Sequence, residues 1–138
     1  MMNVLIVGSG GREHAFTWKA SQSNLVEKIF IAPGNAGTSI ESKAENIDIS
    51  ASDIDALVTF SKNENIDLVI VGPEDPLVNG ITDELKKVGI KCFGPESMGA
   101  QLEGSKDFAK AFMKRHNIPT AGYESFTNAN KAKKYIQQ

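Results

Sequence analysis

Two patterns of apolar positions alternate along this chain: short apolar runs, and longer segments in which apolar residues recur every three or four positions. Short apolar runs are typical of strands buried on both faces of a parallel sheet, and the longer periodicity is typical of amphipathic helices. We expect strands at residues 4–7, 29–32, 46–49, 67–71 and 90–93. We expect helices at residues 13–23, 53–63 and 76–88. Strands alternating with helices predict an α/β fold, here a Rossmann-like open parallel sheet flanked by helices.

The pattern changes after the last of these strands, where short helical segments follow one another. We expect helices at residues 97–103, 106–116 and 129–136, and a strand at residues 123–126. Gly104-Ser105 interrupts the helical pattern. We expect one domain over residues 1–103, and a linker helix with the start of another domain over residues 104–138. The last helical pattern reaches Gln138 without a stop signal, which predicts a fragment of a longer protein.

Composition and charge narrow the function classes. The 138 residues carry a formal net charge of −2, which argues against a general nucleic-acid or membrane-surface binder, because such proteins usually have a basic patch or a pI above about 9. No apolar run approaches the roughly 20 residues of a membrane span, and the N-terminus does not resemble a signal peptide. The single Cys92 excludes an internal disulfide, and we interpret it as a buried apolar residue. We therefore expect a cytoplasmic protein, with its oligomeric state left open.

Three of the predicted strands end in glycine-containing loops, at residues 8–13, 33–37 and 72–75. Ligands of open parallel sheets bind outside the carboxyl ends of the strands, near the point where the strand order reverses. If these three strands are neighbours, their loops converge on one crevice. Each loop taken alone is equally compatible with an ordinary tight turn, so the binding-site hypothesis depends on the convergence.

The first loop places two glycines and an acid at the start of a predicted helix. Backbone N–H groups at a helix N-terminus favour a phosphate or another anion, and Gly10 and Gly11 let a ligand approach the main chain. Glu13 either accepts hydrogen bonds from hydroxyls or an amine of a small ligand, or only complements the helix dipole. A dinucleotide site would have a small residue at position 13 and an acid about 20 positions later. Residues 32–34 are Ala-Pro-Gly, so the loop departs from the NAD pattern.

The other two loops offer polar side chains at strand ends. Asn35 can both donate and accept hydrogen bonds, in a loop that closes at Gly37, and a plain turn is the competing interpretation. Glu74 follows Gly72-Pro73 and is suited to accept hydrogen bonds from ribose hydroxyls. The alternative for Glu74 is an acid that complements a helix N-terminus before Pro76.

Four motifs follow one another along the chain: GSGGREH at 8–14, APGNAG at 32–37, VGPEDPL at 71–77 and LEGSKDFAK at 102–110. Together they resemble the glycinamide ribonucleotide synthetase family, the phosphoribosylamine–glycine ligases of purine biosynthesis. The resemblance implies a Rossmann-like (pre-ATP-grasp) substrate domain followed by the beginning of an ATP-grasp domain. It also implies the reaction of that family, in which glycine and 5-phosphoribosylamine are joined with hydrolysis of ATP to ADP and phosphate. Mg²⁺, or Mn²⁺ in its place, is the metal ion implied.

The resemblance further implies roles for individual residues. Those implied to bind the phosphoribosylamine are Gly10, Gly11, Glu13, Asn35, Gly37 and Glu74. Among these, Glu74 would hold the ribose hydroxyls, and Lys106 would contact a nucleotide phosphate unless it is merely a solvated lysine. Most ligands of ATP, Mg²⁺ and glycine would lie beyond residue 138. We therefore expect no catalytic residue within the chain, and a chain that folds without catalysing the ligation alone.

Two other functions fit part of the sequence. An NAD(P)-binding Rossmann domain of an oxidoreductase would explain the first loop, but the acid after the second strand and the small residue at position 13 are both missing. A non-catalytic module that binds a phosphorylated sugar would use the same binding residues. Only the resemblance distinguishes that module from the ligase.

Overall fold

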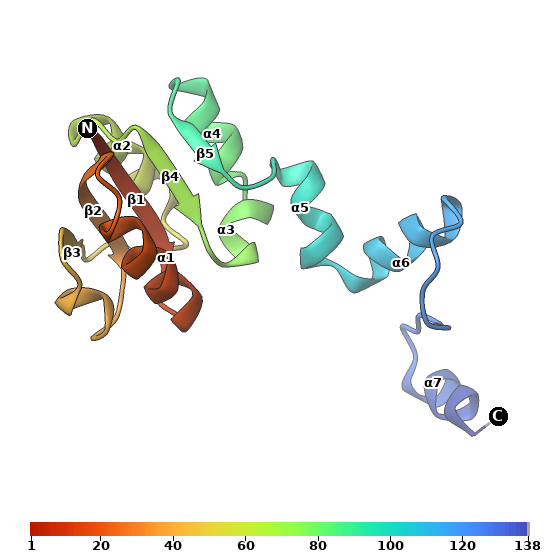
Figure 1. Cartoon of the computed structure of the whole chain (residues 1–138). Helices are drawn as coiled ribbons and strands as arrows, with labels where there is room; N and C mark the ends of the chain where they lie inside the picture. The colour runs from red at the N-terminus through yellow and green to blue at the C-terminus, as the bar shows by residue number, and fades with distance from the viewer. Residues whose placement is uncertain (138) are drawn as a thin grey trace. The chain divides into compact units, whose positions relative to one another are not determined.

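The computed structural model describes residues 1–137 and divides the chain into two compact units, Met1–Ala100 and Gln101–Gln138 (Figure 1). The first unit is built around one sheet of five strands. These are β1 (Met2–Gly8), β2 (Val26–Pro33), β3 (Ala44–Asn46), β4 (Leu68–Val71) and β5 (Lys91–Phe93). All neighbouring strands are parallel, in the order β3-β2-β1-β4-β5. The predicted α/β fold with an open parallel sheet is confirmed.

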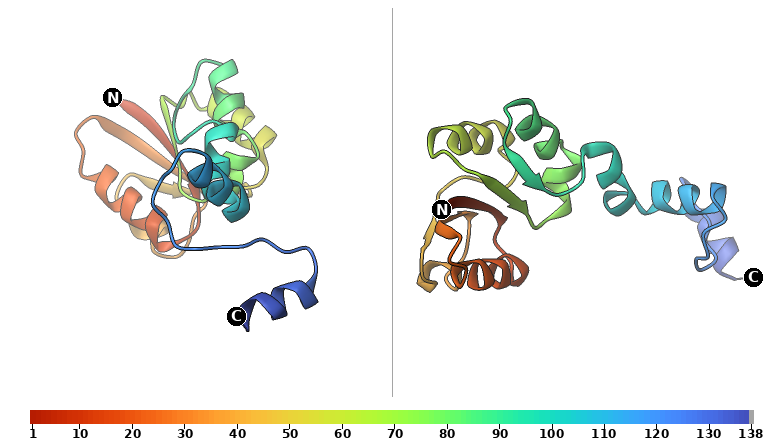
Figure 2. Two further views of the ribbon diagram at one scale, coloured as in Figure 1. Left: turned by 90° about the vertical axis from the view of Figure 1, so that its right-hand side faces the viewer. Right: turned by 45° about the horizontal axis from the view of Figure 1, so that its top comes forward.

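Helices cover both faces of this sheet because successive side chains of a strand point to opposite faces. The helices of the first unit are α1 (Gly11–Ser21), α2 (Ile54–Asn63), α3 (Glu74–Val78) and α4 (Ile81–Lys87). In β1, Val4 and Ile6 pack in the cluster covered by α1, whereas Leu5 and Val7 pack in the cluster covered by the other three helices. Figure 2 shows α1 and these helices on opposite sides of the strands. Burial on both faces explains why β1 is an uninterrupted apolar run.

The connection between β3 and β4 crosses the sheet and brings three loops together. β2 and β3 lie on one side of β1, and β4 and β5 lie on the other, so the strand order reverses beside β1. The register pairs Gly8 with Pro33 and Val7 with Val71. The carboxyl ends of β2, β1 and β4 are therefore neighbours, which is the condition that the sequence set for a common binding site.

Two predicted elements of the first unit differ from the structure. The segment expected as one helix at residues 76–88 forms α3 and α4, because Gly80 between them has a φ of 92°, in the left-handed region that ends a helix. The strand expected at residues 46–49 is β3, which lies earlier and ends at Asn46. A short 3₁₀ helix, η1 (Thr38–Ile40), precedes β3 and was not predicted.

The second unit is mainly helical. Its helices are α6 (Lys106–Arg115) and α7 (Ala129–Ile136), and α5 (Ser97–Gly104) ends within it. Ser105 caps α6 by accepting a hydrogen bond from the Phe108 N–H at 3.2 Å. The strand expected at residues 123–126 is wrong, because the described part of this unit contains no other strand with which it could pair. No helix in the described residues is long and apolar enough to cross a membrane.

Candidate functional site

Backbone hydrogen bonds join the loops that follow β1, β2 and β4. The Gly34 N–H donates to the Gly8 carbonyl at 3.1 Å, and the Gly72 N–H donates to the Val7 carbonyl at 3.0 Å. The three loops that carry the candidate residues therefore lie side by side at one edge of the sheet. This adjacency follows from the strand order.

The side chain of Glu13 folds back onto the start of its own helix. Gly10 is the N-cap residue of α1 and Gly11 its first residue, so Glu13 is the third helical position. Its Oε2 accepts a hydrogen bond from the Gly10 N–H at 2.6 Å, and its Oε1 lies 3.1 Å from Nε of Arg12. This is one half of a capping box, because a glycine at the N-cap has no side chain to complete the other half. Glu13 is only 4% exposed, whereas the Arg12 side chain is 53% exposed.

Three glycines make room for the Glu13 side chain. A Cβ added to Gly8, Gly10 or Gly72 would lie 2.7, 2.9 or 1.8 Å from the nearest Glu13 atom, and real Cβ atoms do not approach so closely. Glu13 therefore fills the space between the β1 loop and the end of β4. Gly72 has a packing role here that its sequence context, a strand end before a proline, did not reveal.

All polar atoms of the Asn35 side chain are used within the loops. Its Oδ1 accepts hydrogen bonds from the N–H groups of Gly37 and Thr38, at 2.7 and 3.0 Å. Its Nδ2 donates to the carbonyls of Ser9 and Gly10, at 2.9 and 3.2 Å. Asn35 thus joins the loop after β2 to the loop after β1.

Two further polar residues fix Asn35 to the sheet. The fully buried Thr38 hydroxyl donates to Oδ1 of Asn46 at 2.7 Å, and Nδ2 of Asn46 donates to the Asn35 carbonyl at 2.8 Å. Asn46 is the last residue of β3, so this loop is anchored to a strand. Sequence reasoning missed both residues, because it placed Asn46 at the start of a strand and assigned no element to Thr38.

Gly37 lies against the ring of His14. A Cβ on Gly37 would be 2.5 Å from Nδ1 of His14, and the other ring nitrogen, Nε2, lies 2.8 Å from Oε1 of Glu41. His14 belongs to α1. Gly37 therefore packs the loop after β2 against α1.

Gly10, Gly11 and Glu74 are the exposed candidate residues of the first unit. A Cβ on Gly11 would meet no atom within 4 Å. Glu74 is the exposed first residue of α3 and follows closely after Gly72, which contacts Glu13. A ligand can therefore reach the Gly11 backbone and the Glu74 carboxylate without displacing protein atoms.

Lys106 belongs to the second unit, where it is the exposed first residue of α6. The six residues expected to bind phosphoribosylamine all lie in the first unit. Within residues 1–137, no group of three or more His, Cys, Asp or Glu side chains could hold a metal ion.

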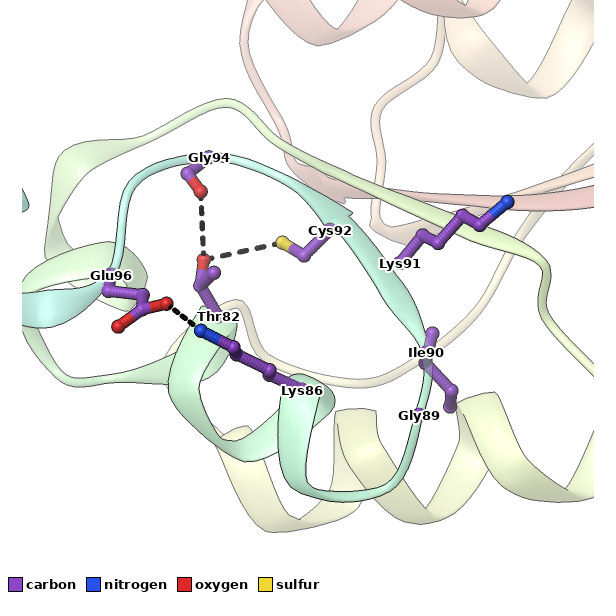
Figure 3. A pocket seen from close by; sticks show the side chains of 8 residues that line it. All are labelled: Thr82, Lys86, Gly89, Ile90, Lys91, Cys92, Gly94 and Glu96. Carbon is purple, nitrogen blue, oxygen red and sulfur yellow. Dashed lines mark hydrogen bonds and ion pairs between the residues drawn. The ribbon is translucent and has the colours of Figure 1, made fainter.

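The first unit has one hollow beside α1 and another between α4 and β5, away from the three loops. One of about 280 Å³ is lined by Gly11, His14, Ala15, Trp18 and Glu41. A second of about 500 Å³, shown in Figure 3, is lined by Thr82, Lys86, Gly89, Ile90, Lys91, Cys92, Gly94 and Glu96. In the second hollow the Thr82 hydroxyl lies 3.3 Å from Sγ of Cys92 and 3.4 Å from the Gly94 carbonyl oxygen. Lys86 and Glu96 form an ion pair there.

Burial raises the pKa of the Cys92 thiol above its usual value, and the hydrogen bond to Thr82 opposes this rise only in part. The thiol is therefore protonated at neutral pH, and a protonated thiol is a weak nucleophile. Cys92 packs against the core as the sequence interpretation expected, but it is only partly buried.

Comparison with known families gives two adjoining matches. Residues 2–103 match the family model described as phosphoribosylglycinamide synthetase, N domain. Residues 104–138 match the model described as phosphoribosylglycinamide synthetase, ATP-grasp (A) domain.

Individual relatives are similar over nearly the whole chain. Phosphoribosylamine–glycine ligase of Haemophilus influenzae is 56% identical over 137 residues, and that of Escherichia coli (strain K12) is 55% identical. Each alignment covers 99% of this chain and 32% of the relative. The chain thus spans about a third of the length of these relatives.

Solved structures are similar in the same way. The crystal structure of phosphoribosylamine–glycine ligase from Thermotoga maritima has a TM-score of 0.65 at 29% identity, covering 98% of this chain and 30% of that one. The biotin carboxylase domain of a single-chain bacterial carboxylase has a TM-score of 0.71 at 17% identity, covering 99% and 34%. The second likeness concerns the fold alone.

Proposed function

The chain belongs to the phosphoribosylglycinamide synthetase family, and from this premise we propose that it is the N-terminal part of a phosphoribosylamine–glycine ligase. The complete enzyme joins glycine to 5-phosphoribosylamine, converts ATP to ADP and phosphate, and gives glycinamide ribonucleotide for purine biosynthesis. Because the chain spans 32% of its relatives, we assign it the binding of the phosphoribosylamine and not the complete reaction. We assign it to the cytoplasm on the same family basis.

The observation that carries this proposal is that the three loops after β1, β2 and β4 lie together beside exposed backbone at the start of α1. The loops are joined by hydrogen bonds, and Gly10 and Gly11 are exposed at the start of α1. Main-chain N–H groups at a helix N-terminus suit a phosphorylated ligand. The exposed Glu74 carboxylate suits ribose hydroxyls, because a carboxylate accepts hydrogen bonds through both oxygens. Glu13, Asn35 and Gly37 complete the site by contacts within and between these loops.

The remaining assignments concern the second part of the chain. We propose a substrate domain over residues 1–103 and the start of an ATP-grasp domain over residues 104–138, in line with the two family matches. Lys106 would contact a nucleotide phosphate from the exposed start of α6. ATP, Mg²⁺ and glycine would be held mostly by residues beyond this chain.

The main alternative, an NAD(P)-binding domain, is weakened by the position of Glu13. A dinucleotide fingerprint needs a small residue for close packing at this point and free N–H groups for the pyrophosphate. Here the Glu13 carboxylate already takes the Gly10 N–H and fills the space in front of Gly72. A pyrophosphate that needs the Gly10 N–H would have to displace the Glu13 carboxylate from it.

Calorimetric titrations of the 138-residue chain with glycinamide ribonucleotide, with NAD and with ATP test the proposal. We expect binding of the ribonucleotide and none of NAD. Glu74→Gln should weaken ribonucleotide binding, and Asp75→Asn, a change at the exposed neighbouring acid, should not. Tight binding of NAD without binding of the ribonucleotide would overturn the proposal.

A second measurement separates the ligase from a module that only binds a phosphorylated sugar. We expect glycine-dependent ADP release from the full-length protein and none from the 138-residue chain. A full-length protein that binds the ribonucleotide without this activity would favour the binding module.

A further inference from the structure

The peptide groups around Gly10 are held from two sides. The Gly10 N–H donates to Oε2 of Glu13 at 2.6 Å. On the other side, Nδ2 of Asn35 donates to the Ser9 and Gly10 carbonyls at 2.9 and 3.2 Å. We call these contacts of Glu13 and Asn35 the Gly10 clamp. Together they fix the orientation of the peptide groups that precede α1.

The Glu13 carboxylate is not available to a ligand in this arrangement. Its side chain is 5% exposed, one oxygen accepts from Gly10, and the other pairs with Nε of Arg12 at 3.1 Å. Gly72 backs the carboxylate so closely that even a Cβ would not fit between them. A ligand hydroxyl would have to displace one of these contacts, and a buried carboxylate resists that loss.

The hydrogen-bonding groups of the Asn35 side chain are likewise occupied by protein atoms. Its amide oxygen accepts two backbone hydrogen bonds from its own loop, and its amide nitrogen makes the two bonds to the loop after β1. The buried Thr38 and the strand residue Asn46 hold its backbone in place. Asn35 therefore links a rigid part of the sheet to the Gly10 peptide.

From these contacts we propose that Glu13 and Asn35 are positioning residues, which fix the Gly10 peptide so that the N–H groups at the start of α1 face the phosphoribosylamine. This inference rests on the proposed function and assigns direct contact to the open Gly11 backbone and to Glu74. The advantage is physical: a loop already held in its binding conformation loses less entropy when the ligand arrives. Gly72 belongs to the device because its missing side chain leaves room for the carboxylate.

The test uses the 138-residue chain with ribose 5-phosphate and 2-deoxyribose 5-phosphate as probes, followed by ¹H–¹⁵N NMR. In the free wild-type chain we expect a downfield, slowly exchanging Gly10 amide. Glu13→Gln, which keeps the size of the side chain and removes its charge, should shift that signal upfield. Asn35→Ala should also move it. Each variant should weaken the binding of both probes by the same factor, about tenfold.

Double variants separate positioning from contact. Glu13→Gln with Asn35→Ala should weaken binding by clearly less than the product of the two single factors, because both changes release one peptide. Glu13→Gln with Glu74→Gln should give the full product, because Glu74 acts on the ligand independently. The remaining amide signals of each variant report whether the chain is folded.

Three results would overturn the inference. One is a Gly10 amide signal that does not move in Glu13→Gln. Another is a double variant of Glu13 and Asn35 whose loss of affinity equals the product of the two single losses. The third is a loss in Glu13→Gln that disappears with the deoxy probe, because it would show that Glu13 touches the ribose hydroxyl. If instead the wild-type chain binds neither probe nor glycinamide ribonucleotide, the proposed function fails, and with it the substrate role of the clamp.

Discussion

The carboxylate of Glu13 occupies the place that a side chain at position 72 would need, since a Cβ on Gly72 would lie 1.8 Å from its Oε1. Glu13 belongs to α1, and Gly72 directly follows β4. The contact therefore ties the start of a helix on one face of the sheet to the end of the neighbouring strand. It also means that the residue at position 72 decides whether the carboxylate can reach Gly10.

The first prediction concerns this contact. Gly72→Ala should lower the free energy of unfolding by about 1–3 kcal/mol, the usual cost of overpacking a well-packed position. The added methyl group would force the buried carboxylate away from the Gly10 N–H, because three Glu13 atoms lie within 3 Å of the new Cβ. Urea unfolding followed by circular dichroism measures the change.

Two comparisons show whether the effect passes through Glu13. Gly122→Ala, where a Cβ would meet nothing within 4 Å, should leave the stability unchanged. In a Glu13→Ala background, Gly72→Ala should lose most of its cost, because the atoms that it meets are gone; a coupling of about 1 kcal/mol or more is expected for residues in contact. Equal costs in both backgrounds would contradict the prediction.

The second prediction separates stability from binding at Gly11. Gly11→Ala should leave stability unchanged or raise it by about 0.4–1 kcal/mol, because the site is open, helical and free of left-handed strain. The same methyl group should weaken the binding of glycinamide ribonucleotide about tenfold, because it lies where the ligand must approach the main chain. Thermal unfolding and calorimetry measure the two quantities. Wild-type affinity in this variant would show that the ligand does not lie on Gly11.

Local patterns in the sequence predicted β1, β2, β4 and β5 well, but they misplaced β3 and added a strand at residues 123–126. They predicted the helices well except where one residue overrides the pattern. Leu77, Ile81 and Leu85 are all buried at a spacing of four residues, so the apolar periodicity continues through the break between α3 and α4. The backbone at Gly80 breaks the helix, because its left-handed conformation interrupts the helix without disturbing which face is buried. Periodicity alone could not reveal this.

The sequence could predict where the candidate site lies, but it could not predict which side chains contact one another there. The three loops could be placed at one edge of the sheet from strand ends and glycines, and the strand order confirms that placement. The direction of the Glu13 carboxylate depends on Gly72, and the setting of Asn35 depends on Thr38 and Asn46. These are tertiary contacts between different elements. Patterns within one segment carry no information about them.

The third prediction follows from the partly buried thiol of Cys92. Because burial raises its pKa, alkylation by iodoacetamide should be slow at pH 7 and should accelerate only at a higher pH than for an exposed thiol. Thr82→Ala removes the hydrogen bond that partly opposes this rise, so it should move the reactivity profile further toward alkaline pH. Mass spectrometry of the modified chain at a series of pH values measures both profiles. Rapid modification of the folded wild-type chain at pH 7 would contradict the prediction.

The last prediction concerns Asp83, whose Oδ2 accepts a hydrogen bond from the Ser97 N–H at 2.8 Å, at the start of α5. This bond lowers the pKa of the Asp83 carboxyl below its usual value of 3.8. A carboxyl group with a lowered pKa in the folded state stabilises the protein above its unfolded-state pKa, and this contribution is lost as the pH falls through the folded-state pKa. Asp83→Asn should therefore be less stable than the wild type at pH 6, and the difference should shrink below pH 3.8 and vanish once the pH is below the folded-state pKa.

Ser97→Pro provides the matched variant, because it removes the donor N–H at the first position of α5, where a helix tolerates proline. Urea midpoints at several pH values should give Ser97→Pro the same loss of acid dependence as Asp83→Asn, and the double variant should add little to either. The wild type and Asp83→Asn could instead differ equally at pH 6 and at a pH low enough to protonate Asp83 in the folded state. In that event the carboxylate would not act through its charge, and the hydrogen bond to Ser97 would not be the source of its effect.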